Sequence, residues 1–266
     1  MADKSIHPET SALAASLARF AHGRARVIDL SYAINDHLPP WPGDKKTFEA
    51  FPNATIERDG YFTRSFWMLE HYGTHLDAPA HFPPGKTTVD EIPAHKLIGP
   101  CVLLDVSAEN HRASASALDY RLPVSRLQEW ESRHGNIPEG AIVLLRTGCS
   151  ARWNTADSYK GMDAAGSMHF PGFSVEAVKY LISKRISGIG ADAMSVDAGD
   201  SKDYAVHTLA LGSDLYQLEN LSDLSAVPES GALLIVAPIK LEGGSGGACR
   251  VFAIIPEKVA GNSRST

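Results

Sequence analysis

The stretch HYGTHLDAPAHF, residues 71–82, restricts the local fold of this chain more than any other segment. Its four potential metal ligands are His71, His75, Asp77 and His81. A helix would place the first two on one face but would direct the other two away from it. Gly73 and Pro79 also disfavour a helix interior, because glycine loses much conformational entropy there and proline lacks an amide donor. The segment is therefore not predicted to be helical.

A continuous strand does not bring these side chains together either. All four would face one side, yet His71 and His75 would lie about 13 Å apart at roughly 3.3 Å per residue. We therefore predict a strand over 63–70 that ends at His71, followed by a turn at 73–74 that returns the later ligands to it. A glycine at the turn supplies the torsional freedom, and we expect Pro79 to hold the next segment extended towards the last histidine.

The stretch combines imidazole and carboxylate groups, a set that suits Zn²⁺, Mn²⁺ or Fe²⁺. It contains no thiolate and leaves coordination positions open, which is typical of a catalytic site and not of a structural one. A histidine-rich surface loop without a ligand role is the alternative interpretation. The coincidence of four candidate ligands at these spacings favours the metal site.

Composition and charge limit the class of protein. The chain has 266 residues, of which 44% are hydrophobic and 21% charged, as in soluble globular proteins. A net charge of −6 disfavours nucleic acid as a partner, and no apolar run reaches the roughly 18–20 residues of a membrane helix. The N-terminal segment makes a poor signal peptide. Cys101, Cys149 and Cys249 are widely spaced and odd in number, so we predict buried free thiols and a cytoplasmic location.

Strand-like runs rich in β-branched and large apolar residues recur along the chain. They cover 25–32, 63–70, 101–107, 141–147, 187–192, 232–238 and 249–255. Helical periodicity covers 125–135, which ends on a glycine, 173–185, where Ser174 is a candidate N-cap, and more weakly 202–212. A short amphipathic helix is predicted over 10–21, and the Gly-rich 242–247 is predicted to be a loop.

These elements predict a single α/β domain with a mixed or antiparallel sheet, because the strand runs are too unevenly separated by helices for a regular βαβ series. The domain is expected to span 25–260. An N-terminal extension with a short helix, 1–24, would precede it, and a C-terminal tail, 261–266, would follow it.

The signature HxGTHxDxPxHF resembles that of the metal-dependent cyclase family, which includes bacterial kynurenine formamidases and isatin hydrolases. Three further elements resemble the family's in the same order: WPGD at 41–44, the helix–strand segment 170–197, and His207 with Glu219, which is followed by Asn-Leu. The resemblance covers most of the chain beyond residue 25. It implies the family's swivelling β/β/α fold and assembly as a homo-oligomer, either a dimer or a tetramer.

The resemblance also implies roles for individual residues. His71, His75 and Asp77 would bind a first metal ion, Mn²⁺ or Zn²⁺, and Asp77 would bridge to a second ion held by His207 and Glu219. His81 would be the general acid/base, and Trp41 would contact the substrate. Segments around 107–135 and 149–170 resemble the isatin hydrolase branch, some members of which use a single Mn²⁺. One or two ions per chain are therefore expected.

Without the resemblance, the three later residues would be interpreted differently. Glu219 alone would be a solvated carboxylate, and His207, in the apolar run AVHTLAL, would be a core histidine with a backbone partner. Trp41, between two prolines, fits a core cap and a substrate-stacking aromatic equally well. The run AMSVD, with Ser195 and Asp197, lacks a nucleophile elbow, so we interpret it as a turn close to the site.

The function that follows is metal-dependent hydrolysis of a small amide or cyclic amide, similar to isatin or N-formylkynurenine. Metal-bound hydroxide would attack the carbonyl carbon, and His81 would pass the proton from water to the leaving nitrogen. Two alternatives stay open: a lactone hydrolase with the same site, and a metal-dependent binding protein without turnover.

Overall fold

The structure is a computed structural model that describes residues 20, 22–23, 25–110 and 118–257. The predicted helix over 10–21 and the tail 261–266 lie outside the described residues, apart from residue 20. Within them, no helix combines the length and apolar character needed to cross a membrane. The three cysteines are buried and unbonded to one another, as predicted.

Eight of the described strands form one sheet, which curls until the strand at one end pairs with the strand next to the other end. In sheet order they are β1 (Ala25–Asp29), β12 (Gly246–Pro256), β11 (Leu233–Pro238), β5 (Ile98–Asp105), β7 (Ile142–Arg146), β9 (Gly188–Ala191), β10 (Tyr216–Glu219) and β4 (His75–Asp77). The long strand β12 also pairs with β4 through its first residues, Gly246–Ala248. The sheet therefore encloses a barrel-like core, and β4 sits between β10 and β12.

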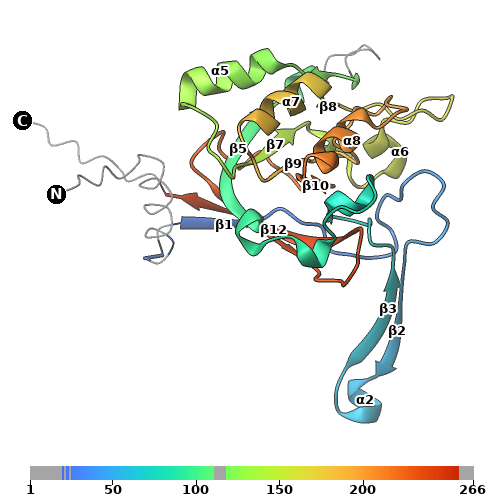
Figure 1. The fold of residues 1–266 in the computed structure, drawn as a ribbon. Helices are drawn as coiled ribbons and strands as arrows, with labels where there is room; N and C mark the ends of the chain where they lie inside the picture. The colour runs from blue at the N-terminus through green and yellow to red at the C-terminus, as the bar shows by residue number, and fades with distance from the viewer. Residues whose placement is uncertain (1–19, 21, 24, 111–117, 258–266) are drawn as a thin grey trace, which may run out of the picture.

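The sheet is mixed, as predicted, but it contains a regular parallel run that was not. Strands β5, β7, β9 and β10 are parallel neighbours. They are joined through α5 (Val124–His134), α7 (Val175–Ser183) and α8 (Ala205–Gly212), which lie together on one side of the sheet (Figure 1). The expectation that no regular βαβ series exists was wrong, because long insertions between strand and helix hide the repeat in the sequence.

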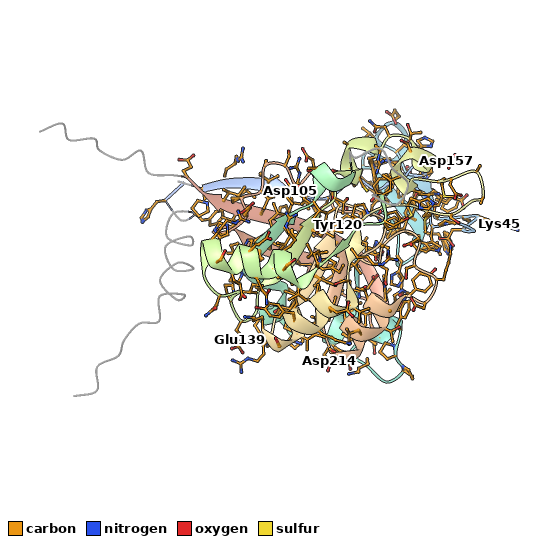
Figure 2. All side chains as sticks on the ribbon, turned by 90° about the horizontal axis from the view of Figure 1, so that it is seen from above. Lys45, Asp105, Tyr120, Glu139, Asp157 and Asp214 are labelled. Atoms are coloured by element: carbon orange, nitrogen blue, oxygen red, sulfur yellow. The ribbon has the colours of Figure 1, made fainter. Side chains whose placement is uncertain are left out.

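Alternating side chains along the parallel strands build a core on each side of the sheet. Val143, Leu145 and Ile189 face the helices, where Leu127 and Leu181 pack against the same cluster. Their strand neighbours belong to a second cluster with residues of β11 and β12, inside the curled sheet. Figure 2 shows the side chains densely packed over this part of the molecule, with Glu139 and Asp214 at its edge.

Local signals place the two longer helices as predicted. The Ser174 side chain accepts a hydrogen bond from the Ala177 amide and begins α7. Gly135, at φ +88°, ends α5 and donates its amide to the Glu131 carbonyl. Each cap satisfies a backbone group that the helix end would otherwise leave unpaired.

Two strands stand apart from the body as a hairpin (Figure 1). They are β2 (Phe48–Ala54) and β3 (Thr63–Met68), with the short helix α2 (Ile56–Asp59) at the tip. The predicted strand over 63–70 is confirmed as β3, while β2 was missed. Loop 242–247 was predicted too long, because Gly246 and Gly247 already belong to β12.

The remaining described elements are short. They are α3 (Ser107–Asn110), β6 (Arg121–Leu122), α6 (Ala156–Lys160), β8 (Gly172–Phe173) and the 3₁₀ helices η1 (Pro79–His81), η2 (Val89–Glu91), η3 (Ala94–Leu97) and η4 (Cys149–Arg152).

Candidate metal centre

The turn predicted between His71 and His75 exists and has the predicted effect. The hairpin strand β3 ends at Met68, and Gly73 adopts φ +67° before β4 begins at His75. A Cβ atom at Gly73 would also lie 2.9 Å from Leu38 Cδ1. The turn brings His71 Nδ1 to 2.6 Å from Asp77 Oδ1 and places the His71 and His75 ring centroids 5.3 Å apart.

Asn220, which follows Glu219 at the end of the neighbouring strand β10, holds this turn through hydrogen bonds. Its side-chain amide donates to the Gly73 carbonyl over 3.0 Å, and its own carbonyl accepts from the Thr74 hydroxyl over 2.7 Å. Asn220 adopts φ +54°, a left-handed conformation that asparagine tolerates better than most residues. The Glu-Asn step therefore supports the ligand-bearing turn.

The segment after Asp77 differs from the prediction. Pro79 does not keep it extended: Pro79 begins the 3₁₀ helix η1, which ends at His81. Proline suits the first position of a helical turn, because its φ is already helical and the missing amide has no partner there. The turn folds His81 back over His71, where the ring centroids are 3.9 Å apart at an interplanar angle of 26°.

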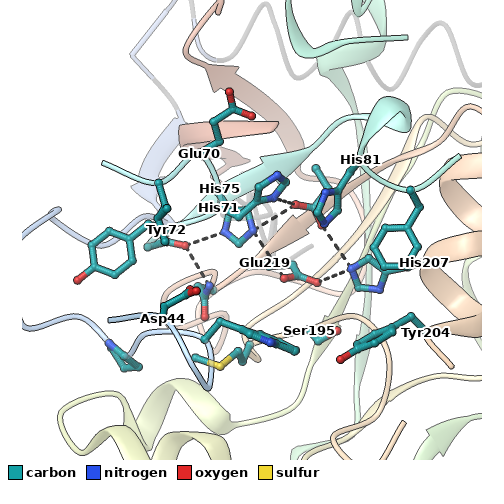
Figure 3. A pocket seen from close by; sticks show the side chains of 18 residues that line it. Asp44, Glu70, His71, Tyr72, His75, His81, Ser195, Tyr204, His207 and Glu219 are labelled. Atoms are coloured by element: carbon teal, nitrogen blue, oxygen red, sulfur yellow. Dashed lines mark hydrogen bonds and ion pairs between the residues drawn. The ribbon is translucent and has the colours of Figure 1, made fainter. Parts of the chain in front are cut away.

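The two distant ligand candidates reach the same place through the sheet and α8. Glu219 on β10 pairs with His75 on β4, and its Oε2 lies 3.6 Å from His75 Nε2. His207 projects from α8, with Nε2 at 3.2 Å from Glu219 Oε1 and 3.5 Å from Asp77 Oδ2. The structure thus gathers all five predicted ligands and His81 around one cavity (Figure 3).

The donor set suits a divalent cation. Asp77 Oδ2 is buried and has no hydrogen-bond partner among the described residues, although an imidazole lies near it. Buried carboxylate oxygens require compensation, which a metal ion supplies. Ligand atoms of His75, Asp77 and Glu219 all lie within 4.8 Å of one another, and so do those of His71, Asp77 and His81.

These two triads share Asp77, which could therefore face two ions. They divide the other residues differently from the expected ligand sets, because His81 lies with His71 and His75 lies with Glu219. His207 contacts both carboxylates but belongs to neither triad.

The buried charges of the cluster shift the pKa values of its members strongly. Burial alone lowers the pKa of His75, but the Asp77 and Glu219 carboxylates outweigh it and raise this pKa to about 9. Burial likewise opposes charge on His207, yet the nearby carboxylates of Asp197, Asp77 and Glu219 raise its pKa well above the usual value. Burial raises the pKa of Asp77, but the imidazoles of His75, His207 and His71 outweigh it and hold this pKa well below its usual range. A cation would replace these protons.

Two of the histidines are oriented by partners on the ring nitrogen that faces away from the cluster. His75 Nδ1 donates to the Gly73 carbonyl over 2.9 Å, and His207 Nδ1 lies 2.6 Å from Asp197 Oδ2. Asp197 is itself fixed by the amides of Val206 and His207. Each Nε2 therefore points at the carboxylates, the arrangement found around metal-binding histidines. The predicted turn at AMSVD does lie beside the site.

His81 differs from the other imidazoles. Burial lowers its pKa to about 4, although the Asp77 carboxylate partly opposes this effect. The ring is therefore neutral around pH 7 and has a nitrogen lone pair able to take a proton. It lies at the cavity, where a substrate would meet it.

The cavity holds about 400 Å³ and has aromatic walls. Trp41, the predicted substrate contact, lies in its lining with Phe82 and Tyr204. The Tyr204 centroid is 6.3 Å from that of Trp41 and 5.9 Å from that of Phe82. None of the described residues that line the cavity is lysine or arginine, whereas Asp44 and Glu70 are among them. Sequence reasoning missed Phe82, although it closes the signature, and Tyr204.

Comparison with known proteins gives a consistent result. Residues 28–198 match the model of the Cyclase family, described as "Putative cyclase". The chain is 32% identical to an isatin hydrolase of Roseibium aggregatum over 263 residues, covering 93% of this chain and 98% of the relative. It is 28% identical to a kynurenine formamidase of Bacillus cytotoxicus, covering 85% and 95%. The solved isatin hydrolase A of Ralstonia solanacearum superposes with a TM-score of 0.81 at 35% identity, covering 91% and 97%.

Proposed function

This chain belongs to the cyclase family of metal-dependent hydrolases, and on that basis we propose that its substrate is a small, flat cyclic amide of the isatin type. The enzyme hydrolyses carbon–nitrogen bonds other than peptide bonds. The cavity supports this choice of substrate, because it places the aromatic side chains of Trp41, Phe82 and Tyr204 beside the carboxylate–imidazole cluster.

The charge of the cavity favours a neutral ring over N-formylkynurenine. That amide carries an α-carboxylate and an α-ammonium group, and its carboxylate needs a cationic or hydrogen-bonding partner when it is desolvated. The described lining offers Asp44 and Glu70 but neither lysine nor arginine. A bicyclic amide of the isatin type carries no such charge, and its flat ring can stack against Trp41 and Phe82.

We propose the following roles for the residues of the site. His71, His75 and Asp77 hold a first divalent ion, and Asp77, His207 and Glu219 hold a second one, both being Mn²⁺ or Zn²⁺. The short distances among these side chains and the unpaired Asp77 Oδ2 support this set. His81 acts as the general acid/base, and Trp41 contacts the substrate.

A divalent cation, when bound, supplies Lewis acidity that activates a water molecule and polarises the amide carbonyl. The side chains of the protein bind the substrate and transfer the protons. The aromatic walls hold the ring and exclude bulk water from it. The neutral His81 ring takes the proton that the attacking water loses, and then returns that proton to the leaving amide nitrogen. These reaction steps need no serine or cysteine nucleophile in the described site.

The test is turnover by metal-stripped protein reloaded with Mn²⁺ or Zn²⁺. We expect isatin to be hydrolysed with a kcat/KM at least about tenfold above that for N-formylkynurenine, and chelator to abolish both activities. Higher activity on N-formylkynurenine, or on a lactone panel, would overturn the choice of substrate. Tight metal binding without turnover of any of them would favour the non-catalytic binding protein.

We also propose that the chain works as a homo-oligomer, a dimer or tetramer, in the cytoplasm. The projecting hairpin carries large apolar side chains on its surface. Among them Tyr61, Phe62 and Phe66 are 59%, 58% and 59% exposed. Exposed apolar side chains grouped on one element are typical of a protein–protein interface, and we propose a second copy of this chain as the partner. Light scattering should show an oligomer for the wild type and a smaller species for a Phe62→Ser, Phe66→Ser variant. A monomeric wild type would refute the oligomer.

A further inference from the structure

Two residues that the reaction scheme does not use form a chain of hydrogen bonds ending on His71. Ser245, in the Gly-rich loop before β12, has its hydroxyl 2.8 Å from His71 Nε2. The same hydroxyl donates to Glu70 Oε2 over 2.7 Å, and the Ser245 amide donates to this oxygen over 2.9 Å. Ser245 lies 174 residues from His71 in the sequence.

The direction of these hydrogen bonds follows from the chemistry of the groups. The Ser245 hydroxyl has one proton, which it donates to Glu70 Oε2. The hydroxyl oxygen must then accept from His71, which places the ring proton on Nε2. His71 Nδ1, which donates to Asp77 Oδ1 over 2.6 Å, is the nitrogen that faces the cluster, and a bound cation would take the place of its proton.

We propose that Glu70 and Ser245 are positioning residues that hold His71 in the Nε2–H tautomer, with Nδ1 presented to the divalent cation. The inference rests on the proposed metal function. It gives His71 what the Gly73 carbonyl gives His75 and what Asp197 gives His207, namely a fixed partner on the ring nitrogen that faces away from the cluster. Such partners typically change metal affinity by roughly 10–100-fold.

His71 needs this support more than the other two histidines. Its side chain is 25% exposed, whereas those of His75 and His207 are 4% and 6% exposed. Packing alone therefore restricts its ring less. The ring also contacts the stacked imidazole of His81, the Asp77 carboxylate and the edge of the His75 ring. Figure 3 shows Glu70 at the back of His71, away from His207 and Glu219.

The backbone around Ser245 is built to bring the loop against His71. The Ser245 carbonyl accepts from the Ala78 amide, immediately after the ligand strand β4. At Gly246 a Cβ atom would lie 2.6 Å from His71 Cε1 and 2.6 Å from the Leu76 carbonyl oxygen. Glycine at 246 is therefore required for the close approach, which explains at least this residue of the EGGSGG run.

The experiment uses full-length protein stripped of metal and titrated calorimetrically with Mn²⁺ and with Zn²⁺. Ser245→Ala removes the hydroxyl but keeps the backbone bond to Glu70. We expect its affinity for Mn²⁺, for Zn²⁺ or for both to fall about tenfold or more. Ser245→Thr, which retains a hydroxyl, should recover most of this lost affinity. Ser230→Ala is the matched control, because Ser230 Oγ lies 3.2 Å from the ring of an exposed histidine, His134.

A second readout separates positioning from general structure. In the Zn²⁺-loaded wild type, two-bond ¹H–¹⁵N spectra of labelled histidine should show a proton on His71 Nε2. Ser245→Ala should lose this pattern or mix it with the other tautomer, while Ser245→Thr keeps it. If Ser245→Ala fails to fold, Glu70→Gln replaces it, with a smaller expected loss in the same direction.

The outcomes are distinguishable. Ser245→Ala, or Glu70→Gln in its place, with wild-type affinity and an unchanged His71 tautomer would overturn this inference and leave the proposed function standing. An equal affinity loss in Ser245→Thr would also overturn it, because the hydroxyl would then be irrelevant. A stripped wild type that binds neither cation would overturn the metal function, and this inference with it.

Discussion

Asp77→Asn tests the centre of the site with the smallest change of shape. The two oxygens of Asp77 lie 2.6 Å from His71 Nδ1, 3.2 Å from His75 Nε2 and 3.5 Å from His207 Nε2. Both ligand triads include this carboxylate. Asparagine replaces one oxygen by an amide nitrogen that carries no lone pair for a cation, and it removes one negative charge. We therefore expect metal content to fall to near zero.

The size of the effect follows from linkage. A cation at about 1,000 times its Kd stabilises the folded state by roughly 4 kcal/mol. A chain of this size shifts its Tm by about 2 °C per kcal/mol. The wild type should therefore gain about 8 °C for each ion bound on adding Mn²⁺ or Zn²⁺ at that ratio, and Asp77→Asn should gain almost nothing. The difference with and without metal cancels the effect of the substitution on the metal-free protein.

The assay is thermal unfolding of stripped protein across a metal titration, together with elemental analysis of metal-replete samples. Asp214→Asn is a suitable control, since this half-exposed carboxylate pairs with Lys86 at the edge of the molecule (Figure 2). It should keep the full metal-dependent gain. If Asp77→Asn kept wild-type metal content and thermal gain, no ion would be bound at this carboxylate, and the proposed ligand set would be refuted.

Three further predictions concern single groups. His81→Ala should keep its metal while kcat falls by roughly 10²–10⁴; parallel loss of metal would make His81 a ligand, as its proximity to His71 and Asp77 allows. Glu219→Gln should reduce about two ions per chain to one, whereas a wild type that carries one ion and keeps it would show a mononuclear site. Since the carboxylates around His75 outweigh burial and raise its pKa to about 9, this group stabilises metal-free protein fully below its unfolded value, about 6.5. The Tm of stripped protein should therefore fall as pH rises from 7 to 10, and a rising Tm would contradict this.

Part of the site could be predicted because its determinants are local in the chain. Gly73 and the spacing of His71, His75 and Asp77 leave one way to bring these side chains together, and the structure adopts it. The same locality explains the correct cap at Ser174. The predicted path of the chain after Asp77 was wrong, because proline is compatible with both an extended segment and the first turn of a helix.

What the sequence by itself determined is the chemistry of the centre, namely imidazoles and a carboxylate on one turn without a thiolate. The tertiary structure alone decided which distant groups meet them. Glu219 faces His75 through the register of β10 on β4, which a slip of one residue would invert. Asp197 meets His207 at the start of α8, and Ser245 meets His71 just before β12, only because the tertiary structure brings these segments together. Strand register and side-chain rotamers depend on contacts across the whole molecule, so residue spacing along the chain cannot encode them.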